Sequence, residues 1–79
     1  MSGTGTFAHV TVKILEKEYN VACPIEEKAA LLASAEFLNL KMREIRDSGK
    51  VVGLDRVAVM AALNIANELL KAHGQDEEL

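Results

Sequence analysis

The sequence predicts an α+β domain in which a β-hairpin is followed by two α-helices, in the order β-β-α-α. Two observations lead to this prediction. Apolar and polar residues alternate near the N-terminus with the period of half-buried strands, and two longer segments of good helix formers follow. A chain of 79 residues, 49% of them hydrophobic, is enough for one folded domain and too apolar for a disordered segment.

The two predicted strands lie on either side of a charged segment. Val10, Val12 and Ile14 alternate with polar residues, and a second alternation runs over Tyr19–Cys23. We expect a hairpin that turns at Glu16–Glu18, although the turn lacks the usual Asn-Gly or Asp-Gly pair. Because an isolated hairpin is marginal in water, it needs a helix on one face or a further strand on its edge. The edge of the first strand is therefore expected to pair with a second copy.

The first helix is expected to begin directly after the second strand and to run to about Asp47. Pro24 suits the first position of a helix, where its missing N–H is not needed. Glu26 and Glu27 follow, and their carboxylates are favourable near the positive helix end. Gly49 suits the left-handed backbone that commonly ends a helix.

The second helix is expected over residues 54–72, with Gly53 or Asp55 as its cap. Plotted at roughly 100° per residue, it has more apolar surface than a surface helix needs. Two apolar seams can be drawn on it: Leu54, Ala58, Ala61, Ile65, Leu69 and Ala72 form one, and Val59, Leu63, Ala66 and Leu70 form the other. One seam can cover the chain's own core, and the other needs a second chain.

These patterns give a set of candidate residues for an interface between copies of the chain. The set combines the inward positions of the first strand with the seams of the second helix. Its members are Val10, Val12, Ile14, Val59, Ala61, Leu63, Ile65, Ala66, Leu69 and Leu70.

The ends of the chain differ from its middle in composition. Residues 1–6 are small and polar and are expected to form a disordered tail, and the acidic residues 74–79 are expected to fray. The folded part is then residues 7–73. Neither a signal peptide nor a membrane span is predicted, and a single cysteine fits a reducing cytosol. We therefore expect a cytoplasmic protein without membrane insertion.

No residue pattern predicts an enzyme, a cofactor or a metal site. Cys23 lies near a helix start, where a thiol can become reactive, but no His or second Cys accompanies it, so a structural role is favoured. His9 and His73 are far apart and lack the spacing of metal ligands. The sequence contains no glycine-rich phosphate loop and no Ser/His/Asp set.

Basic residues gather at the end of the first predicted helix in a chain whose net charge is −3. Lys41, Arg43, Arg46 and Lys50 fall within ten residues, and Lys17 at the hairpin tip would extend the patch if the tip folds toward them. Such a run is either a solvated helix face or a docking surface. The acidic net charge argues against a general binder of nucleic-acid phosphates.

Three segments resemble the ZapA family of bacterial cell-division accessory proteins. They are Val21-Ala22-Cys23-Pro24, Lys41-Met42-Arg43-Glu44-Ile45-Arg46 and Ala61-Ala62-Leu63-Asn64-Ile65 with Glu68-Leu69. The resemblance implies a non-enzymatic partner of FtsZ, the tubulin-like GTPase of the division ring, that crosslinks FtsZ protofilaments at the division site. It also implies dimers through the head and tetramers through a coiled coil that continues the second helix.

The resemblance also suggests which residues would meet FtsZ. Carried over by position, the charged head residues are Lys17, Arg46, Lys50 and Asp55, and the basic cluster adds Arg43 and Lys41. Two alternatives come from other classes. One is a dimeric DNA-binding protein of the ribbon-helix-helix type, which the long first helix and the acidic net charge disfavour. The other is a bare oligomerisation module.

Overall fold

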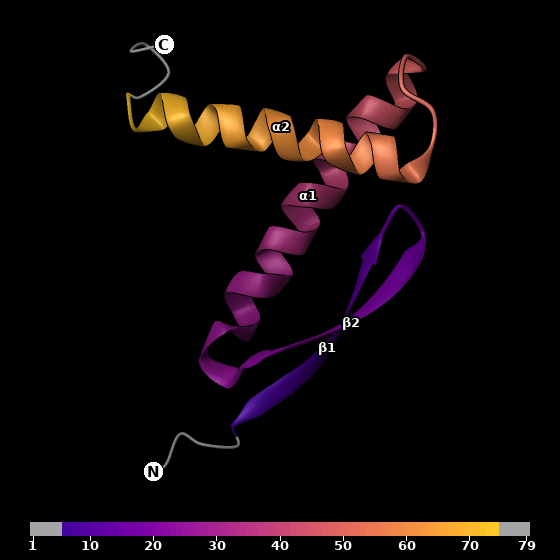
Figure 1. The fold of residues 1–79 in the computed structure, drawn as a ribbon. Helices are drawn as coiled ribbons and strands as arrows, with labels where there is room; N and C mark the ends of the chain where they lie inside the picture. Colours follow the sequence, from indigo (N-terminus) through magenta and orange to yellow (C-terminus); the bar gives the residue numbers. More distant parts are fainter. Residues whose placement is uncertain (1–5, 75–79) are drawn as a thin grey trace. The chain divides into compact units, whose positions relative to one another are not determined.

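Two β-strands, one short 3₁₀ turn and two α-helices follow one another in the computed structural model, which describes residues 6–74 (Figure 1). Their bounds are β1 Phe7–Ile14, β2 Lys17–Pro24, η1 Ile25–Glu27, α1 Lys28–Ser48 and α2 Leu54–Ala72. This order confirms the predicted β-β-α-α fold. The two predicted tails fall largely outside the described residues.

The chain divides into two units, Met1–Leu40 and Lys41–Leu79. The first holds β1, β2 and the first part of α1, and the second holds the remainder of α1 together with α2. Neither described helix is long and apolar enough to cross a membrane.

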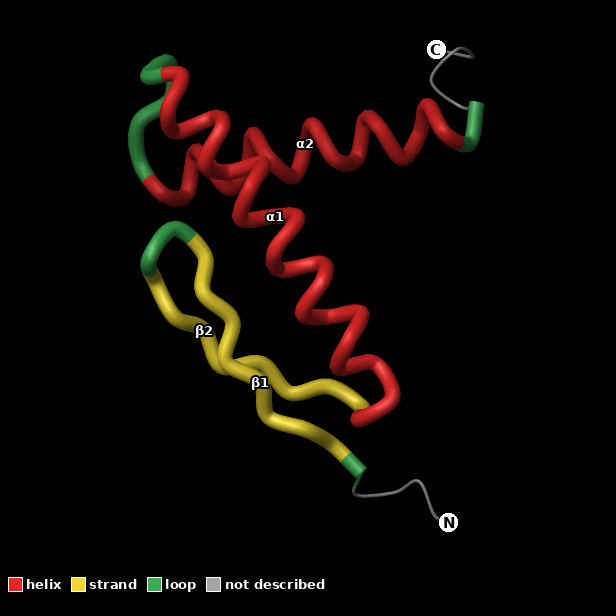
Figure 2. Tube along the Cα trace, turned by 180° about the vertical axis from the view of Figure 1, so that it is seen from behind, coloured by secondary structure: helices red, strands yellow, loops and turns green. Residues whose placement is uncertain are grey.

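A tight two-residue turn joins the antiparallel strands β1 and β2 (Figure 2). Ile14 pairs with Lys17, so the turn consists of Leu15 and Glu16, one residue earlier than the alternation predicted. Both turn residues have positive φ, 49° and 71°, the backbone that two-residue hairpins favour. For residues other than glycine this backbone costs about 1–2 kcal/mol each. The Leu15 N–H donates to Asn39 Oδ1 of α1 at 2.8 Å, which helps to hold the turn.

The hairpin has one apolar and one polar face. Val10, Val12 and Ile14 of β1 are buried together with Cys23 of β2. On the opposite face the Thr11 hydroxyl donates to Asn20 Oδ1 at 2.7 Å, across the two strands. The alternation read from the sequence is therefore confirmed, and the hairpin supplies the core of the first unit.

Both ends of α1 show how local sequence sets a helix boundary. Pro24 ends β2 and, with φ −57° and ψ 143°, caps the 3₁₀ turn, so α1 itself begins only at Lys28. Pro24 was expected at the first position of the helix. The 3₁₀ turn instead separates Pro24 from α1. At the other end Gly49 has φ 73°, the predicted left-handed backbone, and its N–H donates to the Arg46 carbonyl at 3.1 Å.

Helix α2 turns its smaller apolar side chains toward the interior. Gly53, with φ 105°, is the N-cap, and Asp55 lies in the first turn. Val57 and Ala61 are buried, with 2% and 0% of their surface exposed. The seam that contains Ala61 therefore covers the chain's own core through its central residues. The other seam, exemplified by Leu63 at 58% exposure, remains uncovered in the single chain.

We predict that Ala61→Asp lowers the free energy of unfolding by roughly 3–5 kcal/mol, because it buries an unpaired charge at a position without solvent access. Ala62→Asp places the same side chain on the exposed neighbouring position and is the matched control. Urea unfolding followed by circular dichroism measures both. Equal stability of the two variants would contradict the burial of Ala61.

Candidate functional site

An open groove lies at the start of α2, within the second unit. Its volume is about 510 Å³, and the residues that line it are Lys50, Val51, Val52, Asp55, Arg56, Val59 and Met60. The apolar side chains are unusually accessible, with Val52 80% and Val59 57% exposed. Charged groups of both signs therefore surround an uncovered apolar floor, a combination typical of protein-binding surfaces.

The helical spacing of the groove residues explains why they lie together. Asp55 and Arg56 each lie three or four residues from both Val52 and Val59, which places the four residues on one side of α2 and its preceding turn. The structure thus brings together Lys50 and Asp55, two of the residues that the family resemblance indicated.

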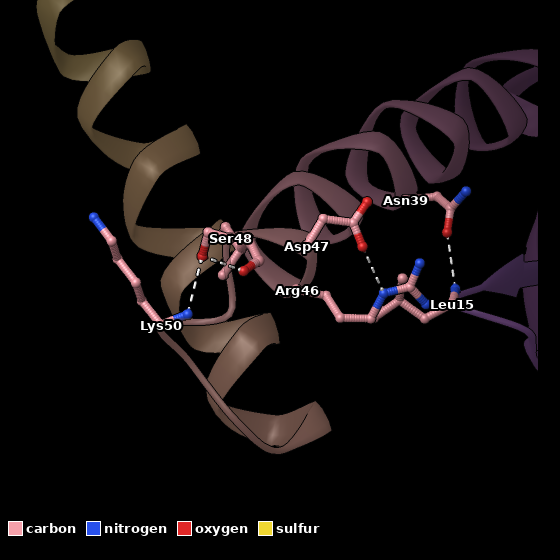
Figure 3. Close-up of polar contacts among 7 residues, drawn as sticks. Leu15, Asn39, Arg46, Asp47, Ser48 and Lys50 are labelled. Carbon is pink, nitrogen blue, oxygen red and sulfur yellow. Dashed lines mark hydrogen bonds and ion pairs between the residues drawn. The ribbon is translucent and has the colours of Figure 1, made fainter.

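The loop that carries Lys50 is held by hydrogen bonds at the end of α1 (Figure 3). Ser48 Oγ donates to the Ile45 carbonyl at 2.6 Å and accepts from the Lys50 N–H at 3.3 Å. These contacts fix the backbone of Lys50 while its side chain remains exposed.

The basic residues of α1 do not form one continuous patch. Arg43 and Arg46 are three residues apart and share a side of the helix, whereas Lys41 points about 160° away from Arg43. The Arg46 Nε donates to Asp47 Oδ1 at 3.3 Å (Figure 3). Lys41 Nζ lies 3.0 Å from Glu68 Oε2 of α2. The ammonium of Lys41 is thus engaged within the chain.

Lys17 lies at the first position of β2, directly after the hairpin turn, and its side chain is exposed. It belongs to the first unit, while the groove belongs to the second. The expectation that Lys17 extends the basic patch therefore stays a prediction.

The candidate interface residues separate into buried and exposed groups. Val10, Val12, Ile14 and Ala61 are buried within the single chain, and Ile65 is half-buried. Their side chains are therefore not surface groups, although the backbone edge of β1 is not paired within the described sheet. The exposed members are Val59, Leu63, Ala66, Leu69 and Leu70.

The sequence analysis did not assign Val52, Arg56 or Met60 to a site. Met60 is a signal in the sequence, because it is an apolar side chain on the side of the second helix where Asn64, Asn67 and Lys71 also lie. Val52, Arg56 and Met60 follow one another at intervals of four residues, which places them on one side of the helix start. Val52 and Met60 thus form a second apolar area there. This area is the floor of the groove.

Cys23 lies among the apolar residues of the hairpin, with 8% of its surface exposed. It faces Ala8 in the strand pairing, on the same side as Val10. Among the described residues there is no group of three or more His, Cys, Asp and Glu side chains that could hold a metal ion.

Comparison with protein families gives a match over most of the chain. The family model described as "Cell division protein ZapA" matches residues 10–79. A relative named cell division protein ZapA, from Pseudomonas aeruginosa, is 62% identical over 61 residues, which cover 77% of this chain and 59% of that protein. A relative of the same name from Pectobacterium atrosepticum is 29% identical over 69 residues, covering 87% and 63%. The chain thus spans about three fifths of the length of these curated relatives.

One solved structure is also similar. A protein described as an unknown conserved bacterial protein from Pseudomonas aeruginosa PAO1 superimposes with a TM-score of 0.71 at 55% sequence identity. The matched region covers 87% of this chain and 75% of that protein. The likeness therefore extends to the fold as well as to the sequence.

We predict that Cys23→Ala lowers the free energy of unfolding by about 1–2 kcal/mol, because it removes a small buried apolar group. The native thiol should also react slowly with an aromatic disulfide reagent, and quickly only in urea. Chemical unfolding and thiol titration measure the two effects. A fast-reacting native thiol would show that Cys23 has a chemical role instead of a structural one.

Proposed function

Because the chain belongs to the ZapA family of cell division proteins, we propose that it binds FtsZ and crosslinks FtsZ protofilaments, without catalysis, in the cytoplasm at the division site. Family membership carries the role in division. The specific partner and the bundling of its filaments are the proposed part.

The groove at the start of α2 is the observation that best supports binding to a protein partner. It places Lys50, Arg56 and Asp55 around the apolar side chains of Val52 and Met60. Protein interfaces gain most from apolar contacts at the centre, while charges at the rim speed association and select partners. FtsZ is acidic, as the family resemblance implies, so cations at the rim suit it.

Arg43 and Arg46 extend the cationic surface along α1 in the same unit. We assign them, with Lys50 and Asp55, to the FtsZ-binding surface, and Lys17 to a second contact from the hairpin. Exposed charge pairs are individually weak, about 0–1 kcal/mol, and salt screens them. A binding surface built from such pairs therefore has to be present in several copies to bind firmly.

Self-association would supply these copies. Beyond the groove, the exposed Leu63, Ala66 and Leu70 form an apolar stripe along α2 that a second copy can cover. A dimer, or a tetramer through a continued α2, presents two or more copies of the groove. Once one groove is bound, the next binding event is intramolecular, so weak contacts add to a firm crosslink.

We predict that Arg46→Glu combined with Lys50→Glu abolishes co-sedimentation with GTP-polymerised FtsZ. The reversal replaces attraction by repulsion at Lys50 on the groove rim and at Arg46 on α1. Both side chains are exposed, so the circular dichroism spectrum should not change. Wild-type binding should also weaken as salt is raised from low to physiological concentration.

The matched control is Lys28→Glu combined with Lys71→Glu, which changes the net charge equally at exposed positions away from the groove. This variant should bind nearly as well as wild type. If both doubles bind FtsZ normally at physiological salt, the docking surface lies elsewhere, and Lys13 and Lys17 on the hairpin become the next candidates. If wild type itself does not bind, a bare oligomerisation module remains.

We predict that the chain sediments as a dimer or larger assembly at micromolar concentration. Leu63→Glu should shift it toward smaller species, because the charge falls in the middle of the exposed apolar stripe. Analytical ultracentrifugation measures both. A stable, folded wild-type monomer would refute the prediction that self-association completes the fold.

A further inference from the structure

Helix α2 has two apolar stripes on opposite sides, and only one of them packs inside the chain. The inner stripe is Val57, Ala61 and Ile65, and the outer stripe, beyond the groove, is Leu63, Ala66 and Leu70. At roughly 100° per residue, Leu63 points about 160° away from Ala61. The inner stripe is buried or half-buried, and every member of the outer stripe is exposed.

Apolar area alone does not explain this choice. The outer stripe carries two leucines, whereas the centre of the inner stripe is Ala61. Burial stabilises in proportion to the apolar area removed from water, so the larger side chains would gain at least as much from an inward position. A further interaction is needed to select the inner stripe.

The ion pair between Lys41 and Glu68 is placed to make that selection. Glu68 lies seven residues after Ala61, which brings it within about 20° of the inner stripe. Its Oε2 is 3.0 Å from Lys41 Nζ on α1, and both residues belong to the second unit. The two side chains are 25% and 56% exposed, so the contact lies at the surface. With the outer stripe turned inward, Glu68 would point away from Lys41, and this contact would be lost.

We propose that the Lys41–Glu68 ion pair determines which stripe of α2 packs inside the chain and thereby keeps the outer stripe free for a second copy. Polar pairs beside apolar interfaces can fix the register and partner of a helix even where they add little stability. Lys41 then acts within the chain and not on the partner surface. The claim that a second copy covers the outer stripe rests on the proposed function. The claim that the ion pair selects the inner stripe does not.

The test uses methyl NMR of the full chain labelled with ¹³C at Met and Ala methyl groups. Met42 and Ala61 are the reporters, because they are 2% and 0% exposed and so sense the packing of α2. The charge-swapped double Lys41→Glu with Glu68→Lys keeps the pair and should give one resonance for each reporter, as wild type does. Lys41→Gln with Glu68→Gln removes both charges without adding apolar surface beside the inner stripe, and should give a second set of resonances at roughly 10% of the intensity or more.

The control is Glu44→Gln with Lys71→Gln, which removes one acidic and one basic charge from exposed side chains of the same two helices. It should keep single Met42 and Ala61 resonances. Glu68→Gln alone, which leaves the Lys41 ammonium in place, should give a weaker second set than the glutamine double.

The proposal is overturned if the glutamine double and Glu68→Gln both keep a single wild-type set of resonances. It is also overturned if the glutamine double unfolds while the charge swap folds, because the pair would then be needed for stability and not for selection. Native mass spectrometry of the same samples reports the assembly separately. A monomeric wild type would therefore refute the proposed oligomer while leaving the selection of the stripe to the NMR result.

Discussion

One helix with apolar side chains on opposite sides is the constraint on which the rest of this chain depends. A small domain covers only a limited fraction of its surface, and one side of α2, which includes Leu63, is exposed among the described residues. Burial of Val57 and Ala61 completes the core of the second unit. The same burial directs Leu63 and its neighbours to solvent. The packing of the core therefore also determines which apolar side chains lie on the surface.

The groove and the outer stripe share this helix, and their positions are therefore coupled. The groove lies at the first turns of α2, around Asp55 and Arg56, whereas the outer stripe runs along the helix toward Leu70. In an assembly formed through the stripe, the helix direction fixes where each groove points. A change in the packing of α2 would consequently alter the spacing between two bound partners without altering any residue that contacts them.

The sequence predicted the secondary-structure elements better than it predicted the contacts between residues. Alternation over Val10–Ile14 and the glycine at position 49 report local backbone preferences, and both predictions were confirmed. The hairpin turn was placed one residue late, because no glycine or asparagine marks it. The pairing of Lys41 with Glu68 joins residues 27 positions apart, so no local pattern contains it. The groove was missed for a different reason, because Val52, Arg56 and Met60 recur at helical spacing but span the boundary between the loop and the helix that begins at Leu54.

The hairpin turn also has a consequence for the order of folding. Leu15 and Glu16 both adopt a backbone that is unfavourable for residues with a side chain, so the turn has little tendency to form by itself. One stabilising contact comes from Asn39, 24 residues away on α1. The turn therefore gains this contact only together with the helix. We expect hairpin and helix to form in one cooperative step, with nucleation in the helix and not at the turn.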